Sequence, residues 1–207
     1  MTTAIIGLGN MGKGLARRLA GKTDLVVAAR NTETASALAN ALPNTRAASV
    51  EDAIAQSEIV VIATHYGDAR DLAAGAALDG KILVDITNPI KPDFSGLLFG
   101  HSTSAAEEIQ AAASGARVVK AFNTIFAQLF DIPAVATADV PVYIAGDDEE
   151  AVKAVADLVR KAGFAPESAG GLDAARLLEP LGMLNIRFGY GLGRGTAIAP
   201  NWLSIAA

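Results

Sequence analysis

The sequence predicts an α/β fold with a doubly wound parallel sheet, and three observations lead to this prediction. Short runs of β-branched residues alternate with alanine-rich amphipathic stretches along the chain. The runs are apolar at consecutive positions, which is typical of strands that helices cover on both faces. A glycine-rich turn follows the first run and opens the first amphipathic stretch. Strands and helices that alternate in this way form a parallel sheet with right-handed crossovers.

The strands and helices can be placed by the period of their apolar residues. Continuous apolar runs predict strands at 4–6, 25–27, 59–62, 82–84, 117–119 and 142–144. Apolar positions repeated every three or four residues indicate helices. On this criterion we expect helices at 11–20, 32–42, 50–56, 69–78, 151–162 and 174–188.

Two helix starts are marked by their capping residues. Ser104 and Glu107 have the spacing of a capping box before Ile109. The acidic run 147–150 precedes helix 151–162, which closes with basic residues and a glycine. This order of charges complements the helix dipole. The acidic run is therefore interpreted as a solvated helix start rather than a metal site.

The chain divides into a dinucleotide-binding region at 1–170 and a C-terminal helix and tail at 171–207. The tail is too short to fold alone, and the glycine-rich segment 189–195 predicts irregular structure. A chain of 207 residues can bury a large core without disulfides, and it has no cysteine. The lack of cysteine fits a reducing cytoplasm, where we expect the protein to be found.

Composition excludes several classes of function. The formal charge of −5, with no Lys/Arg stripe, argues against a nucleic-acid partner. The start of the chain has no signal-peptide pattern, and the longest apolar run is too short to span a membrane. Hydrolase and zinc-site motifs are absent as well.

The glycine-rich turn indicates a Rossmann-type dinucleotide site. Gly7, Gly9 and Gly12 have G-x-G-x-x-G spacing between a strand and a helix. In this motif the first glycine allows the tight turn, the second admits the pyrophosphate, and the third lets helix and strand pack closely. The helix N-terminus then faces the phosphates.

Arg30 decides which dinucleotide is expected. An NAD site keeps an acidic residue about twenty positions after the glycine turn, where it binds the ribose hydroxyls. Here the second strand ends in Ala29, Arg30 and Asn31. A guanidinium offers a fork of donors that matches phosphate oxygens. We therefore expect NADP(H), with Arg30 and Asn31 near its 2′-phosphate.

The nicotinamide is expected at the carboxyl ends of the later strands, where open α/β sheets bind their ligands. Polar residues follow three of these strands, and Pro89 stiffens one of the loops. Thr64, Asn88 and Asn123 are candidates to hold the ribose or carboxamide, and His65 is placed to touch the cofactor. For each of them, capping of a loop is an equally good interpretation.

No acid–base pair stands out, so no catalytic residue is assigned. Hydride exchange between nicotinamide and a flavin-like ring requires two stacked rings that the protein orients. Reduction of a carbonyl would instead require a proton donor. Only His65 and Tyr66 come near that description.

Longer segments resemble a known family. GLGNMGKGLARRLA, VVAAR, VVKAFNTI and GDDEEAVKAVADLVRKAGFAPESAGGLDAARLLEPLGMLNI together resemble the NADPH-dependent deazaflavin (coenzyme F420) reductases. The pattern is also similar to the cytoplasmic NADPH-binding domain of six-transmembrane metalloreductases. The resemblance covers essentially the whole chain, and its most specific parts are KAFNT and the GDD…GF…AR…LEP run.

The resemblance implies roles for individual residues. Leu8, Gly9, Asn10 and Met11 would wrap the pyrophosphate, and Ala29 with Arg30 would face the 2′-phosphate. The residues implied at the nicotinamide side are His65 or Tyr66, Asn88, Asn123 and Ala127. It also implies a homodimer, a small-molecule redox acceptor, and a C-terminal region that closes the acceptor pocket.

Two departures from the family pattern affect these expectations. Where the deazaflavin enzymes carry a lysine for the 2′-phosphate, this sequence has Thr34, which predicts a milder preference for NADP(H). Where some members carry a histidine, this sequence has Asn123, which leaves open whether coenzyme F420 or a flavin is the acceptor. Arg187 and Arg194 are candidates to meet the anionic tail of a deazaflavin.

Two alternatives remain. Imine and 3-hydroxyacid reductases share the G-L-G-x-M-G start, but they usually continue into a long helical domain, which we do not expect in these 207 residues. A non-catalytic NADP(H)-binding module would have the same residues around the nucleotide. Turnover of the corresponding substrates separates these alternatives from a deazaflavin or flavin reductase.

Overall fold

A computed structural model describes residues 1–203 and 205 of the chain. One sheet of eight strands has the order β3-β2-β1-β4-β5-β6-β7-β8. The strands are β1 Thr2–Ile6, β2 Asp24–Ala28, β3 Thr45–Ala47, β4 Ile59–Ile62, β5 Ile82–Asp85, β6 Arg117–Lys120, β7 Pro141–Gly146 and β8 Ala165–Gly170. The helices are α1 Asn10–Leu19, α2 Thr32–Asn40, α3 Val50–Ala55, α4 Tyr66–Gly75, α5 Ala105–Ala112, α6 Ala134–Thr137, α7 Glu149–Lys161 and α8 Ala175–Ile186.

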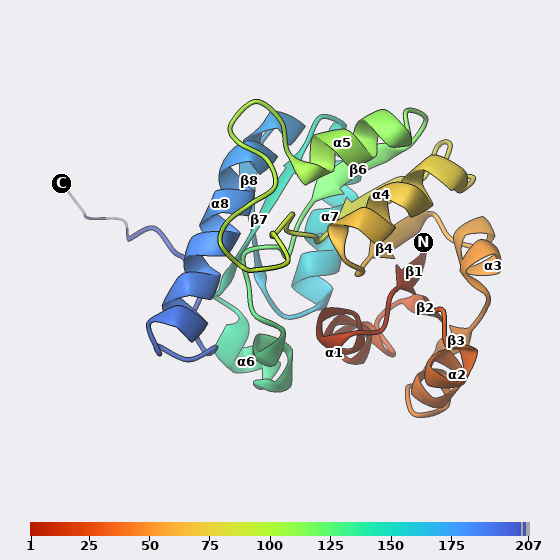
Figure 1. The fold of residues 1–207 in the computed structure, drawn as a ribbon. Helices are drawn as coiled ribbons and strands as arrows, with labels where there is room; N and C mark the ends of the chain where they lie inside the picture. Colours follow the sequence, from red (N-terminus) through yellow and green to blue (C-terminus); the bar gives the residue numbers. More distant parts are fainter. Residues whose placement is uncertain (204, 206–207) are drawn as a thin grey trace.

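Helices cover both faces of the sheet (Figure 1). Side chains of α1, α2 and α7 join one core cluster, and those of α3, α4 and α5 join the other. Alternate residues of a strand face opposite sides, so Ile59 and Val61 of β4 enter the first cluster while Val60 and Ile62 enter the second. Burial on both faces explains why the strands are apolar at every position.

The predicted doubly wound α/β fold is confirmed, with one difference in strand direction. Strands β1 to β6 are parallel to their neighbours, but β7 runs antiparallel to β6 and carries β8 parallel to itself. Strands β3 and β8 were not predicted. Strand β3 has only three residues, and β8 carries Pro166, Glu167 and glycine, so neither shows a β-branched run.

The predicted helices are present with shifted ends. The helix expected at 69–78 begins at Tyr66 and ends at Gly75. The two predicted caps are confirmed, since Ser104 Oγ accepts a hydrogen bond from Glu107 N at 3.2 Å and Asp148 caps α7.

The prediction of irregular structure throughout 189–195 is wrong in its first part. Helix α8 continues as a π-helical turn at Arg187–Gly191 before the chain leaves helical geometry. Gly189 is buried against the Phe126 ring, where a Cβ would lie 2.5 Å from a ring carbon, so this glycine serves close packing.

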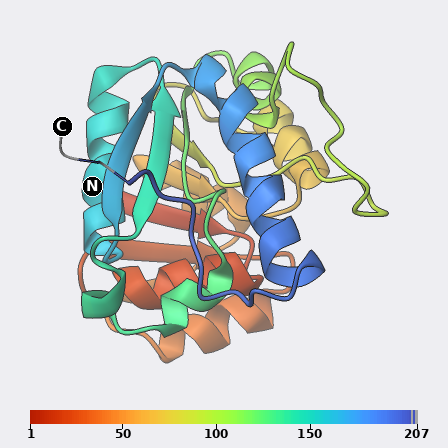
Figure 2. The same ribbon diagram turned by 90° about the vertical axis from the view of Figure 1, so that its left-hand side faces the viewer.

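Helix α8 lies beside the sheet near β7 and β8, and the chain that follows it runs back across this side (Figures 1 and 2). The loop between β5 and α5 projects next to α8 (Figure 2). Leu178 of α8 packs with Tyr143 and Ala145 of β7. The division of the chain at residue 170 stays a prediction.

Candidate functional site

The turn between β1 and α1 has the geometry that its glycines predict. Gly7 adopts φ +94°, and a Cβ there would lie 2.6 Å from the carbonyl oxygen of Ala63. A Cβ on Gly12 would lie 1.9 Å from the carbonyl oxygen of Gly7. Gly9 precedes the first helical residue, and the space that its Cβ would occupy is open. The turn therefore leaves open space against the backbone at the start of α1.

The start of α1 can bind an anion. The N–H groups of Asn10, Met11 and Gly12 precede the first hydrogen bond of the helix, which Lys13 donates. No acidic side chain lies in the first turn. Exposed N–H groups and the helix dipole favour a phosphate here, so these residues fit the pyrophosphate of a dinucleotide. Leu8, within the turn, is buried in the core cluster that α1 also joins.

Arg30 lies at the end of β2 with its side chain 90% exposed. Its Nη2 forms an ion pair with Asp68 Oδ2 of α4 at 3.3 Å. Asn31 caps α2, because its Oδ1 accepts a hydrogen bond from the backbone N–H of Thr34 at 3.1 Å. The side-chain amide nitrogen of Asn31 is left to donate a hydrogen bond to a ligand. Ala29 has no polar side-chain atom, so it could contact a ligand polar group only through its backbone. Asp68 was not predicted, because it lies in α4, 38 positions after Arg30 in the sequence.

The β4–α4 connection holds three further predicted residues. Thr64 donates to the carbonyl of His65 at 3.3 Å, and His65 is exposed before the start of α4. The Tyr66 ring packs edge-on against Phe99 at 5.2 Å between centroids. Burial raises the pKa of the Tyr66 phenol, so it keeps its proton at neutral pH. None of the three lines the 910 Å³ cavity at the carboxyl ends of β5 and β6. Pro89 is buried and does not line it either.

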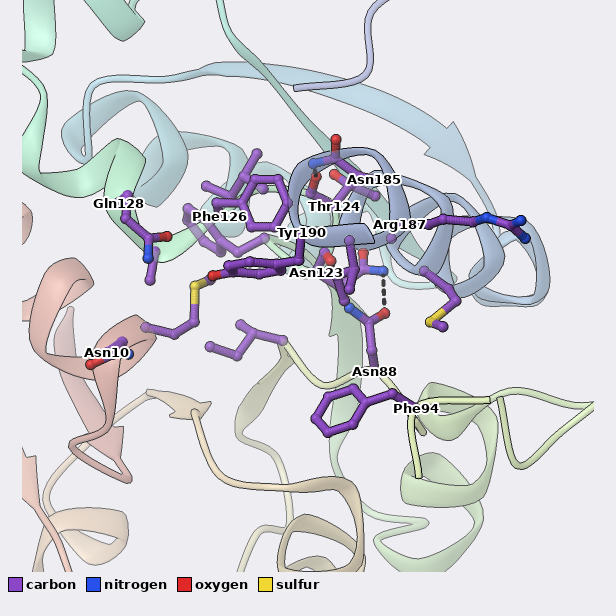
Figure 3. Close-up of a pocket in the computed structure, with 18 of the residues that line it drawn as sticks. Asn10, Asn88, Phe94, Asn123, Thr124, Phe126, Gln128, Asn185, Arg187 and Tyr190 are labelled. Carbon is purple, nitrogen blue, oxygen red and sulfur yellow. Dashed lines mark hydrogen bonds between the residues drawn. The ribbon is translucent and has the colours of Figure 1, made fainter. Parts of the chain in front are cut away.

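A cavity of 910 Å³ lies at the carboxyl ends of β5 and β6, next to the start of α1. Figure 3 shows side chains from these segments converging on it, with Tyr190 between Phe126 and Asn88. The lining residues are Asn10, Met11, Ile86, Asn88, Phe94, Ser95, Phe122, Asn123, Thr124, Ile125, Phe126, Ala127, Gln128, Gly182, Met183, Asn185, Ile186, Arg187, Tyr190 and Gly191. The volume is in the range of small-molecule sites.

The lining is apolar and aromatic, with neutral amides as most of its polar groups. It contains no carboxylate, histidine, lysine or cysteine among the described residues. Arg187 is its one charged member and extends away from the other labelled side chains (Figure 3). Arg194 does not line this cavity, because its guanidinium stacks on Phe188 at 4.8 Å. The cavity therefore suits a planar ring and offers no strong acid or base.

Two asparagines join the ends of β5 and β6 in the cavity wall. Asn88 Nδ2 donates to the Asn123 carbonyl at 2.8 Å, and Asn123 Nδ2 donates to Asn88 Oδ1 at 2.9 Å. The residue before Asn123 is strained, since the fully buried Phe122 has φ +60°. A left-handed conformation costs a bulky residue about 1–2 kcal/mol. Strain of this kind gathers at functional sites.

The structure brings together five of the residues predicted from sequence: Asn10, Met11, Asn88, Asn123 and Ala127 all line the cavity. Thr64, His65 and Tyr66 lie on the neighbouring strand end, and Ala29 to Thr34 lie beyond the glycine turn. The roles of all these residues stay predictions. The wall contributed by the β5–α5 loop was not predicted. The resemblance implied that the C-terminal region closes the pocket, and α8 does line the cavity, but of the wall residues in this region only Arg187 was named beforehand. The aromatic Tyr190 inside a glycine-rich run could have indicated a site.

Neither a membrane helix nor a metal centre is found in the described part of the chain. No helix there is long and apolar enough to cross a bilayer. No group of three potential metal ligands occurs there either, and the acidic run 147–150 opens α7 as predicted.

Comparison with known proteins identifies relatives over most of the chain. The family "NADP oxidoreductase coenzyme F420-dependent" matches residues 2–89. The F420-dependent NADP reductase of Methanocaldococcus jannaschii is 30% identical over 87% of this chain and 89% of that protein. Metalloreductase STEAP3 of Rattus norvegicus is 33% identical over 86% of this chain, but this chain spans only 35% of its length.

Solved structures also match this chain over most of its length. A protein from Arthrobacter sp. FB24 that carries the provisional name F420-dependent NADP reductase is 29% identical, with a TM-score of 0.82 over 94% of this chain and 96% of that chain. A reductive aminase from Aspergillus terreus in complex with NADPH shares the fold, at 18% identity and a TM-score of 0.69, over 93% of this chain and 62% of that chain. The sequence relatives and this fold establish that the chain belongs to the family of coenzyme F420-dependent NADP oxidoreductases.

Proposed function

We propose that the protein transfers hydride between NADPH and a planar deazaflavin or flavin ring held in the 910 Å³ cavity. The observation that carries this proposal is the chemistry of the cavity wall. It is apolar and aromatic, it lies at the strand ends where nicotinamide binds in this fold, and its described lining holds no carboxylate, histidine, lysine or cysteine, with Tyr190 as its one phenol. Hydride transfer between two rings needs orientation and no protein proton donor.

The residues around the glycine turn fit the nucleotide. The N–H groups at the start of α1 would bind the pyrophosphate, and Arg30 would bind the 2′-phosphate after leaving Asp68. Met11 and Asn10 extend from this turn into the cavity, so they join the phosphate site to the ring site. When bound, NADPH supplies the hydride.

The cavity wall would orient the two rings. Asn88 and Asn123 hold the ends of β5 and β6 together and present amides at one wall. Phe126 and Tyr190 pack edge-to-face at 5.4 Å between centroids and would cover the ring from the side of α8. An apolar cover excludes water and suits a flat aromatic acceptor.

The acceptor follows from size and charge. Arg187 at the rim is placed to meet an anionic tail, which both deazaflavin and flavin cofactors carry. The name of the Methanocaldococcus relative supports a deazaflavin. Because Asn123 stands where some family members carry a histidine, flavins should be tested as acceptors alongside coenzyme F420.

Stopped-flow oxidation of NADPH tests the proposal. Coenzyme F420, FMN and FAD are offered in turn to the purified protein, and absorbance at the nicotinamide band is followed. We expect rapid oxidation with one of these rings, no oxidation of NADPH by pyrroline carboxylates, and no reduction of NADP⁺ by 3-hydroxyacids. Turnover of the latter substrates would show an imine or hydroxyacid reductase instead. Tight NADPH binding without oxidation by any acceptor would show a binding module.

A further inference from the structure

Three charged side chains form a buried ion cluster beneath the cavity: Asp85 of β5, Lys120 of β6 and Glu179 of α8. Lys120 and Asp85 are fully buried, and Glu179 is 2% exposed. The Lys120 ammonium donates to Asp85 Oδ2 at 2.8 Å, to Glu179 Oε1 at 2.8 Å and to the carbonyl of Thr87 at 2.6 Å. Its three protons are thus all used. Glu179 Oε2 also accepts from the backbone N–H of Ala105 at 3.0 Å.

The cluster has a regular relation to the cavity wall. Three positions after the cluster residue, each of its three segments contributes a wall residue: Asn88, Asn123 and Gly182. Asn88 and Asn123 are hydrogen-bonded to each other. Asn123 Nδ2 also donates to the Leu178 carbonyl of α8 at 2.9 Å. Ionic contacts and amide contacts therefore join the same three segments.

Helix α8 sits directly on these strand ends at Gly182. A Cβ there would lie 2.8 Å from the Asn123 carbonyl oxygen and 2.9 Å from both amide atoms of Asn88. Gly182 follows Glu179 by about one helical turn, so both face the sheet. The ion pair to Lys120 and the missing side chain at 182 together set how closely α8 approaches the wall.

Stability alone does not account for a buried cluster of this kind. Buried ion pairs lose much of their attraction to desolvation, and apolar replacements of similar volume are often as stable. The value of a fully hydrogen-bonded network is that it fixes one geometry. Burial raises the pKa of the Glu179 carboxyl, because desolvation disfavours its charged form.

We propose that the buried ion cluster is the positioning element of the ring site, and that it holds α8 against β5 and β6 at the spacing that two stacked rings require. This inference rests on the proposed hydride transfer. Lys120, Asp85 and Glu179 act as positioning residues, because they lie beneath the wall and reach the rings only through it.

Four variants test the positioning role. Glu179→Leu removes the contact between α8 and Lys120, which keeps Asp85 as its partner, and Glu179→Gln restores an acceptor of the same size. Gly182→Ala pushes α8 outward without changing any charge. Arg176→Met is the matched control, because Arg176 ties α8 to Glu107 away from the cavity, with Nε 2.9 Å from Oε2.

The readouts separate positioning from stability. For Glu179→Leu and Gly182→Ala we expect the single-turnover hydride-transfer rate and kcat to fall on the order of 10- to 100-fold. The Kd for 2′,5′-ADP, which occupies only the adenosine side, should stay within about twofold. Glu179→Gln should be intermediate, and Arg176→Met should match the wild type in rate.

A second readout needs no acceptor. The fluorescence of bound NADPH depends on how rigid and apolar the nicotinamide surroundings are, so the same two variants should lose emission while Arg176→Met keeps it. If no acceptor oxidises the wild-type complex, the proposed function fails and the emission still decides the role of the cluster. Wild-type rates and emission in both Glu179→Leu and Gly182→Ala, with only lower thermal stability, would overturn the inference. Should Glu179→Leu not fold, Glu179→Gln and Gly182→Ala decide it in the same way.

Discussion

At the scale of single residues, we propose that Arg30 and Asp68 together set the preference between the two dinucleotides. The sequence predicted the guanidinium at the adenosine end, but the carboxylate opposite it comes from α4 and was not predicted. In the ion pair Asp68 neutralises Arg30, and it would also repel a 2′-phosphate. On this proposal, the preference for NADPH depends on a competition between this carboxylate and the phosphate for one guanidinium.

Opposite substitutions should move that preference in opposite directions. Arg30→Ala should weaken NADPH binding about tenfold, because an exposed charge-assisted bond is worth about 1.5 kcal/mol. Asp68→Asn should tighten NADPH binding about two- to fivefold, since an exposed ion pair is worth up to about 1 kcal/mol. NADH binding should change little in either variant. Titration of nucleotide fluorescence gives the four dissociation constants.

Asp79→Asn is the control for net charge. Asp79 is exposed in the turn before β5, at the amino ends of the strands, whereas Arg30 lies at the carboxyl ends. It should bind both nucleotides like the wild type. In an Arg30→Ala background, Asp68→Asn should lose most of its effect. Equal NADPH and NADH affinities in the wild-type protein would remove the assignment of Arg30 to the 2′-phosphate.

The ion pair between α5 and α8 carries a pH dependence at the scale of elements. The hydrogen bonds from Arg176 hold the pKa of the Glu107 carboxyl below its ordinary value of 4.5. A carboxyl with a lowered pKa in the folded state stabilises the fold above its ordinary pKa. That stabilisation disappears as the pH falls through the lowered value.

The prediction concerns the difference in unfolding free energy between the wild type and Glu107→Gln. The difference should be constant at neutral pH and should vanish as the pH falls from 4.5 through the lowered pKa. Urea unfolding at a series of pH values measures it. Glu51→Gln is the matched control, because Glu51 also lies in the first turn of a helix. A difference for Glu107→Gln that persists unchanged in acid would contradict this account.

Elements were predicted where a local pattern existed. Strands such as β4 are apolar throughout because both faces are covered, and caps such as Ser104 are readable from a few residues. The antiparallel direction of β7 was not predictable, because its apolar run would look the same in either direction. The resemblance implied that the C-terminal region closes the pocket, but Gly182 and Tyr190 were not named, because they join Asn88 and Asn123 in the cavity lining only through long-range packing.

At the scale of the whole molecule, the exposed side of α8 is unusually apolar. Leu177 is 69% exposed and Leu184 is 45% exposed, two turns apart on the helix. Leu192, which follows the π-helical turn, is exposed as well. Apolar patches of this kind mark association surfaces. We propose that the expected homodimer forms through this side of α8.

Replacement of two leucines tests the dimer. The double variant Leu177→Lys with Leu184→Lys should shift the protein from two chains to one, because lysines desolvated in an apolar interface are costly. Light scattering coupled to gel filtration measures the mass. Val135→Lys is the control, since Val135 is 87% exposed on α6 and outside this surface. A wild-type protein that is monomeric at all concentrations would rule the dimer out.

The ends of the sheet limit how copies of the chain can meet. One outermost strand, β3, is three residues long and carries Arg46, and the other, β8, carries Pro166 and the exposed Glu167. Short, charged or proline-bearing borders resist strand-to-strand polymerisation. Contacts between copies are thereby left to helical surfaces, so the ladder of eight strands stays complete within each chain and concentrated solutions should not nucleate fibrils from the folded state.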